Sequence, residues 1–257
     1  KGWLAVEEGT GFVGESYIVA TGGTIVTSGS FKTHIFTGPG TFTVCSAASS
    51  APNSRVDYVV IAGGGSGGNF GAGGGGAGGF RLSNAVGCVP APTTSPLVAP
   101  ANLPVSATSY PIVVGGGGTA GTGTNTPGAP NTDAVNGQKG NNSSFSTITS
   151  AGGGGGSGIV NCWAPSPLSG GGSGGASKGS STNPGDQPGN AYPVGAGNTP
   201  PVAPPQGNNG GGGYDGKSVS TQGGGGGGAG AVGATTCTQD TGAAGGIGSY
   251  VSDTFIG

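Results

Sequence analysis

Glycine runs set the strongest limit on what this chain can fold into. Residues 63–80 read GGGSGGNFGAGGGGAGGF, and six further runs follow at 115–118, 152–158, 170–175, 210–213, 223–230 and 242–248. Glycine costs about 1 kcal/mol at an interior helix position, and no window shows a sustained 3.6-residue period. With 66 Gly and 19 Pro among 257 residues, the sequence predicts essentially no α-helix.

The residues before the first run have the pattern of ordinary β protein. The stretch FKTHIFTGPGTFTV (31–44) places β-branched and aromatic residues on both sides of a Gly-Pro-Gly turn, which predicts a hairpin with Phe36 paired across from Phe42. Residues 17–29 predict two strands joined by a turn, and RVDYVVIA (55–62) predicts the strongest strand. We therefore expect a β-rich N-terminal region over residues 1–62 and a glycine-rich domain over residues 63–257.

Three interpretations of the glycine runs compete. Flexible linkers are commonly Gly/Ser-rich, but a linker has no need of the apolar strands and aromatic residues between these runs. The stretch GGGYDGKS (211–218) matches a phosphate-binding loop, yet such a loop requires a preceding strand and a following helix. Neither is present in the flanking sequence, so the pattern does not indicate nucleotide binding.

The third interpretation is a packed array of extended glycine helices. Polyproline II geometry has three residues per turn and no internal hydrogen bonds, so its amides and carbonyls can bond to neighbouring helices. Non-glycine residues should then lie three apart on exposed edges, as in the pairs Ala77/Phe80, Ala229/Val232 and Ala244/Ile247, while GGGGGG (223–228) should be covered on all sides. The predicted fold class is non-helical, with a β-rich N-terminal region and an array of polyglycine II helices with β segments.

The sequence stretches between the glycine runs, taken in order, resemble those of a known protein family. YIVATGGTIVTSGSFKTHIFTGPGTFTV, VDYVVIAGGGSGG, YPIVVGGGG, FSTITSAGGGGG and GNTPPVAPPQGNNGGGG occur in that order. Over roughly residues 17–230 they resemble the glycine-rich domain of marine bacteriophage tail-fibre proteins. More widely, the chain is similar to phage adhesins built from stacked polyglycine II helices. The resemblance implies a virion protein that serves in fibre structure or host attachment.

No catalytic or metal-binding pattern is recognised in the sequence. The single histidine, His34, lies in a predicted strand and is interpreted as a surface strand residue, and the nine carboxylates are scattered. We therefore expect no enzymatic activity, no metal and no cofactor. The four cysteines at 45, 88, 162 and 237 show no CxxC pair, so disulfide pairs and free thiols both remain open.

Binding is expected on loops between glycine helices. The candidate receptor-binding residues are the aromatic and acidic side chains Trp163, Tyr192, Tyr214 and Asp215, for which packing over the array is the alternative role. Expected partners are further copies of the chain in a homotrimer, other tail proteins, and a host-surface glycan or outer-membrane protein. Scattered basic residues argue against nucleic acid, and no apolar stretch is long enough for membrane insertion.

Two other function classes remain open from sequence alone: an extracellular filament or matrix protein of a cell, and an ice-binding protein. An ice-binding face would need small residues at a strict period of three on a flat surface, and this chain is irregular. The chain begins at Lys1, so we expect a processed form or a piece of a longer protein.

Overall fold

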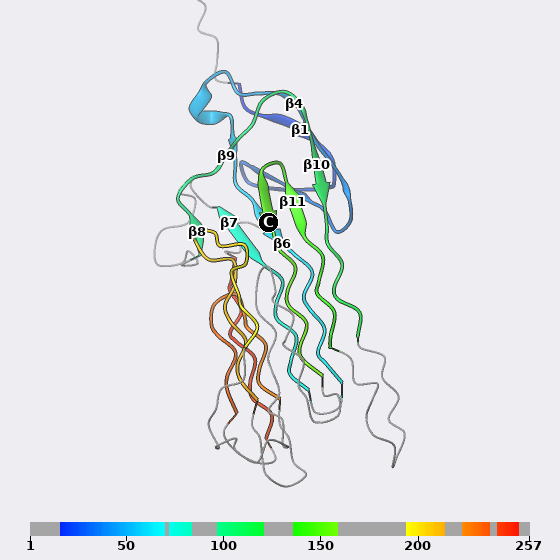
Figure 1. Ribbon diagram of the computed structural model, residues 1–257. Coiled ribbons are helices and arrows are strands. Elements are labelled where there is room, and N and C mark those ends of the chain that lie inside the picture. Colours follow the sequence, from blue (N-terminus) through cyan, green and yellow to red (C-terminus); the bar gives the residue numbers. More distant parts are fainter. Residues whose placement is uncertain are drawn as a thin grey trace, which may run out of the picture.

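The computed structural model describes residues 16–69, 72–83, 97–120, 136–158, 194–213, 223–236 and 241–251. Figure 1 shows small sheets at one end, from which the glycine-rich segments run side by side. Apart from one short 3-10 helix, η1 (Ala51–Asn53), the described residues contain no helix. The expectation of a non-helical, β-rich fold is therefore confirmed for this part of the chain.

Twelve short strands form within the described residues, and all lie before residue 151. They are β1 (Val19–Thr21), β2 (Thr24–Ser28), β3 (Phe31–Ile35), β4 (Gly40–Ser46), β5 (Arg55–Val56), β6 (Val59–Ile61), β7 (Phe80–Ser83), β8 (Val98–Ala99), β9 (Leu103–Pro104), β10 (Ser109–Val113), β11 (Ser143–Phe145) and β12 (Ile148–Ser150).

These strands assemble into four small sheets. The largest has the order β1-β4-β10-β11-β12 and is antiparallel throughout. The others are β2-β3, β5-β9 and β6-β7-β8, in which β7 and β8 are parallel. The five-stranded sheet combines strands from both sides of residue 62, so β structure continues into the glycine-rich part. The division into two domains at residue 62 stays a prediction.

The hairpin predicted over residues 31–44 is wrong. Strand β3 pairs with β2 across the turn at Gly29, which has φ +56°, and β4 pairs with β1 and β10 in another sheet. Phe42 lies opposite Tyr110 rather than Phe36. At the Gly-Pro-Gly sequence the chain passes from one sheet to another. The turn residues alone do not distinguish such a crossing from a hairpin.

The strand predicted over residues 55–62 is also interrupted. β5 pairs with β9, whereas β6 pairs with β7, so the apolar run serves two sheets. The tyrosine between the two strands, Tyr58, is only 6% exposed and belongs to the core. A continuous apolar run here reflects burial and not one continuous strand.

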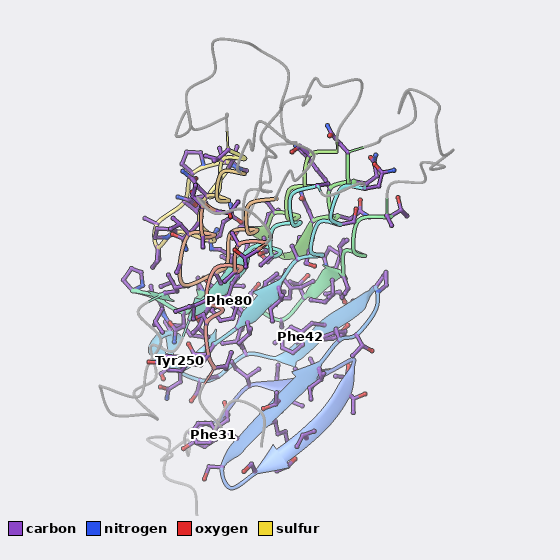
Figure 2. The ribbon with its side chains drawn as sticks, turned by 90° about the horizontal axis from the view of Figure 1, so that it is seen from below. Phe31, Phe42, Phe80 and Tyr250 are labelled. Carbon is purple, nitrogen blue, oxygen red and sulfur yellow. The ribbon has the colours of Figure 1, made fainter. Side chains whose placement is uncertain are left out.

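An aromatic cluster forms the main core between the sheets. Phe42 and Phe145 meet edge to face, with ring centroids 5.7 Å apart, and Tyr110 lies 6.0 Å from Phe145. Edge-to-face contacts of this kind are worth about 0.5–1.5 kcal/mol beyond area burial. Figure 2 shows Phe42 and Phe80 inside the molecule, and Phe31 on the β2–β3 hairpin.

The glycine-rich segments bond to one another at intervals of three residues. The amides of Ala62, Gly65 and Gly68 donate to the carbonyls of residues 79, 76 and 73, which run antiparallel to them. One residue further on, Gly63 and Ser66 donate to residues 141 and 138 of a different segment. Successive residues therefore form hydrogen bonds with different neighbouring segments. In a flat β-sheet, by contrast, the hydrogen-bonding pattern repeats every two residues.

Two segments lie inside this network. Residues 151–158 are buried throughout and receive hydrogen bonds from 73–79 and from 137–140. Residues 224–228 are likewise buried, and residues 223–228 exchange hydrogen bonds with four segments, 74–77, 208–211, 231–234 and 243–246. The expectation that GGGGGG is covered on all sides is confirmed for 224–228.

Steric crowding explains why the covered segments are glycine. A Cβ on Gly226 would fall on the carbonyl oxygen of Gly75, and one on Gly225 would fall on that of Ala244. The predicted exposed edges are confirmed at Ala244 and Ile247. They are wrong at Phe80 and Ala229, which are buried together with Leu82 in a second apolar cluster.

A proline-rich turn is fastened to the array by two polar side chains. Asn198, with φ +51°, accepts hydrogen bonds from the amides of Val202 and Gln206 and donates to the Val202 carbonyl. Gln206 is 1% exposed; its amide nitrogen donates to the Pro200 carbonyl, and its oxygen accepts from the Ala151 amide. The segment 198–206 is thus a structured part of the fold.

Candidate functional site

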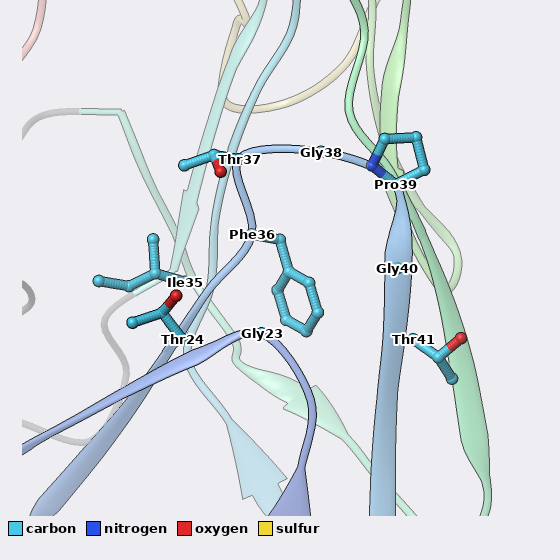
Figure 3. A pocket seen from close by; sticks show the side chains of 9 residues that line it. All are labelled: Gly23, Thr24, Ile35, Phe36, Thr37, Gly38, Pro39, Gly40 and Thr41. Atoms are coloured by element: carbon cyan, nitrogen blue, oxygen red, sulfur yellow. The ribbon is translucent and has the colours of Figure 1, made fainter.

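A hollow beside Phe36 is the candidate binding site of the described residues. It has a volume of about 260 Å³ and lies where β3 leads into β4 (Figure 3). Its lining consists of glycines, threonines and three apolar residues: Gly23, Thr24, Ile35, Phe36, Thr37, Gly38, Pro39, Gly40 and Thr41.

Glycines make room for the Phe36 ring in this hollow. Gly22 and Gly23 have φ of +110° and +64°, so the chain turns there in a conformation that L side chains rarely adopt. A Cβ on Gly23 or Gly40 would stand 3.1 Å from the Phe36 ring. The ring therefore lies against two chain segments whose glycines bring no side chain close to it (Figure 3).

His34 fixes the corner that carries the hollow. Its Nδ1 lies 2.8 Å from the Gly22 carbonyl oxygen, and because a carbonyl only accepts, the ring nitrogen donates. The ring also meets Phe42 edge to face with centroids 5.0 Å apart. His34 lies on β3 as predicted, but it is half-buried and has a structural partner.

The chemistry of the lining is neutral. Thr24, Thr37 and Thr41 contribute hydroxyl groups, Phe36 contributes an aromatic ring, and no charged side chain lines the hollow. Hydroxyls next to an aromatic ring suit an uncharged hydroxylated ligand, because the ring packs on C–H groups while the hydroxyls exchange hydrogen bonds. An ionic ligand would find no countercharge among these residues.

A second polar cluster lies in the core near β5, β6 and β7. The Ser83 hydroxyl donates to Asp57 Oδ1 at 3.0 Å and accepts from the Tyr58 amide at 3.2 Å. Burial raises the pKa of the Tyr58 hydroxyl, and the nearby Arg81 opposes this effect. Ser83 is fully buried, and its hydroxyl bonds to Asp57 and to the Tyr58 amide rather than to a histidine, so this cluster resembles a core network more than a nucleophile with a base.

The candidate receptor-binding residues chosen from sequence, Trp163, Tyr192, Tyr214 and Asp215, lie outside the described residues. The same holds for Cys88, Cys162 and Cys237. Cys45 is described, on β4, as an exposed free thiol. No sequence pattern singled out Phe36 or Gln206 as a site residue. Glycines on both sides of Phe36 and the isolated Gln after Pro-Pro are the only signals that could have indicated them.

Searches for two other kinds of site were negative within the described ranges. No cluster of three or more His, Cys, Asp or Glu side chains there could hold a metal ion. In the same part of the chain, no helix has the length and hydropathy needed to cross a membrane.

Comparison with known proteins gives one match. A family model described as a glycine-rich domain matches residues 36–256, which is most of the chain. No curated protein and no solved structure matches it. On the strength of the family model, this chain belongs to the glycine-rich domain family.

Proposed function

We propose that the glycine-rich segments are polyglycine II helices that form the rigid scaffold of a bacteriophage tail-fibre protein. The period of three in the inter-segment hydrogen bonds supports the helix type, because polyglycine II completes a turn every three residues. The crowding of would-be Cβ atoms against neighbouring backbone supports close packing of such helices.

The functional proposal rests on one observation: a glycine-rich segment forms backbone hydrogen bonds with neighbouring segments in several directions. Segment 223–228 exchanges backbone hydrogen bonds with four other segments, so bending one helix requires breaking bonds to several. Each bond is worth only about 0.5–1.5 kcal/mol net, but all of them act together. A rigid, weakly charged body of this kind suits a fibre whose packing must depend little on ionic strength.

Host attachment is the proposed role of the surface carried by this scaffold. The ordered resemblance of residues 17–230 to phage fibre domains supports this role. Loops can vary without disturbing the array, and Trp163, Tyr192, Tyr214 and Asp215 remain the proposed receptor contacts on them. The neutral hollow beside Phe36 is a further proposed contact, suited to a surface glycan. No reaction, metal or cofactor forms part of the proposal.

Partners and location follow from the same proposal. Fibres commonly contain three chains, so we propose a homotrimer that joins other tail proteins in the virion and meets a host-surface glycan or outer-membrane protein after release. The division into a β-rich region (1–62) and a glycine-rich domain (63–257) is retained as the proposed organisation.

Adsorption of the purified protein tests the function. The protein should bind host cells and compete with the parent virus for attachment. If it neither binds nor competes, but particles lacking it have altered fibre length, it is a shaft component and not an adhesin. Detection on cells that carry no virus would reject the phage assignment and favour an extracellular filament protein.

A further inference from the structure

Among the described residues, the segment 241–251 forms an open edge of the glycine array. Over residues 241–250 its exposure repeats every three residues: residues 243, 246 and 249 are partly buried, and the two residues between each of them are exposed. The amides of Ala243 and Gly246 donate to the carbonyls of Gly223 and Gly226 at 3.2 and 2.8 Å. One row of this segment therefore faces the array, and two rows face outward.

One outward row consists entirely of glycine, although nothing in the described part of the chain requires it. A Cβ on Gly242 or Gly248 would have no atom within 4 Å, and one on Gly245 would lie 3.7 Å from the nearest atom, the Gly226 carbonyl oxygen. The φ angles of these three residues lie outside the left-handed region. Inside the array, by contrast, there is no room for a side chain, because a Cβ on Gly226 or Gly228 would strike neighbouring backbone.

The same row leaves its hydrogen-bond donors available. Within the described residues, the amides of Gly242, Gly245 and Gly248 donate no hydrogen bond. Proteins commonly protect such edges with Lys, Pro or inward-pointing charges, and the stretch TGAAGGIGSYV (241–251) contains no charged residue and no Pro. The edge therefore lacks the features that prevent pairing with another chain.

Large apolar side chains flank the glycine row. Ile247 and Tyr250, three residues apart on the other outward row, are 75% and 50% exposed. The bend at 229–232 touches this edge through the Gly230 amide, which donates to the Ile247 carbonyl at 2.9 Å, and it adds Val232, 60% exposed. Exposed apolar groups beside a backbone edge are typical of an interface.

We propose that this edge is a self-association surface, on which a second copy of the chain packs an extended glycine segment against Gly242, Gly245 and Gly248. The bound segment must approach closely enough to accept hydrogen bonds from the backbone amides of the glycine row. The glycine segments of this chain already pack on one another in that way. Absence of charge on the edge removes repulsion between identical chains. The array would thus continue from one molecule into the next.

The inference rests on the proposed three-residue-per-turn array, and not on the virion role. Sedimentation velocity of the full chain over a wide concentration range tests it, with Gly245→Val as the variant. Because the added Cβ would meet only an ordinary van der Waals contact, 3.7 Å from the Gly226 carbonyl oxygen, the fold of the single chain should survive, and far-ultraviolet circular dichroism checks this. Gly38→Val is the control, since Gly38 has open space around its Cβ position and lies in the β3–β4 turn.

The expected result is concentration-dependent association of the native chain, weakened at least tenfold by Gly245→Val and unchanged by Gly38→Val. Raising the concentration should also slow hydrogen exchange at the amides of Gly242, Gly245 and Gly248. A native chain that stays monomeric at all concentrations overturns the proposal, as does a folded Gly245→Val variant that associates as tightly as the native chain. If the chain associates normally although its glycine-rich segments are disordered, the helix proposal on which this one rests is overturned instead.

Discussion

Gln206 accepts a hydrogen bond from the backbone amide of Ala151, 55 residues earlier in the chain, at 2.9 Å. Ala151 directly follows β12 and opens the buried segment 151–158, while Gln206 closes the proline-rich turn. The amide nitrogen of the same Gln206 side chain donates to Pro200 at 2.9 Å. One side chain thus joins the sheets, the array and the turn.

Replacing this glutamine should be costly. Gln206→Leu keeps a similar volume but leaves the buried Ala151 amide and the partly buried Pro200 carbonyl without the Gln206 partner, and a buried unsatisfied group costs about 1–3 kcal/mol. We expect a loss of roughly 2–4 kcal/mol in the free energy of unfolding, measured by denaturant titration. Gln138→Leu is the control, because Gln138 is exposed and, among the described residues, only its backbone groups form hydrogen bonds. Equal losses would contradict the assigned role of Gln206.

Two fully buried serines should respond differently to loss of the hydroxyl. Ser83 Oγ bonds to Asp57 and to the Tyr58 amide, whereas Ser150 Oγ has no hydrogen-bond partner among the described residues. Ser83→Ala should cost about 1–3 kcal/mol. Ser150→Ala should be neutral or stabilise by up to about 1 kcal/mol, because it removes an unpaired buried hydroxyl. A larger loss at Ser150 in thermal unfolding would show that its hydroxyl is paired.

The loss of stability caused by replacing a glycine should depend on whether that glycine faces a neighbouring segment or open space. Gly226→Val places a side chain against the Gly75 carbonyl, so neighbouring helices must separate. We expect a loss of about 2–4 kcal/mol. Gly248→Val points into open space and should change the melting temperature of the monomer little. Ser66→Val is not a suitable control, because the Ser66 hydroxyl donates to the Thr119 carbonyl and accepts from the Gln138 amide. Similar melting temperatures for Gly226→Val and Gly248→Val would contradict the packed array.

The free energy of unfolding should fall at high pH in a way that depends on Tyr58. Burial raises its pKa above 10.0, the ordinary value for tyrosine, so the folded state holds the phenolic proton more tightly than the unfolded state does. This contribution is complete below pH 10 and is lost as pH rises through the folded pKa. Tyr58→Phe should flatten that loss in denaturant titrations at several pH values. Tyr17→Phe, at a 71% exposed position, should not.

The sequence predicted composition-driven features well and long-range ones poorly. The absence of α-helix from the described residues and the burial of 224–228 followed from glycine itself, because its cost in a helix and its lack of a Cβ are local properties. β3 pairs with its immediate neighbour β2 across the turn at Gly29, whereas β4 pairs with β10, whose Ser109 lies 66 residues after Thr43; the Gly-Pro-Gly turn encodes neither choice of partner. Phe80 and Ala229 were assigned to an exposed edge because the period of three says which residues share a face, but not which face is covered.

The candidate site was less predictable than the fold. Phe36 was expected in a cross-strand pair, and its role in lining a hollow depends on Gly22 and Gly23, which approach it from an earlier part of the chain. The structured turn at 198–206 reads as low-complexity sequence. Its order comes from Asn198 and Gln206, whose partners are buried backbone groups that sequence patterns do not reveal.

Residue-resolved hydrogen exchange by NMR over segments 62–68 and 73–79 tests the central claim most directly. In these segments the amides of residues 62, 63, 65, 66, 68, 73, 74, 76, 77 and 79 donate backbone hydrogen bonds, whereas those of 64, 67, 75 and 78 donate none within the described chain. A packed three-residue-per-turn array predicts slow exchange at the first group and fast exchange at the second, that is, two protected amides followed by one open amide. Uniformly fast exchange, as in a flexible linker, or protection that alternates every second residue, as at a strand edge, would contradict it.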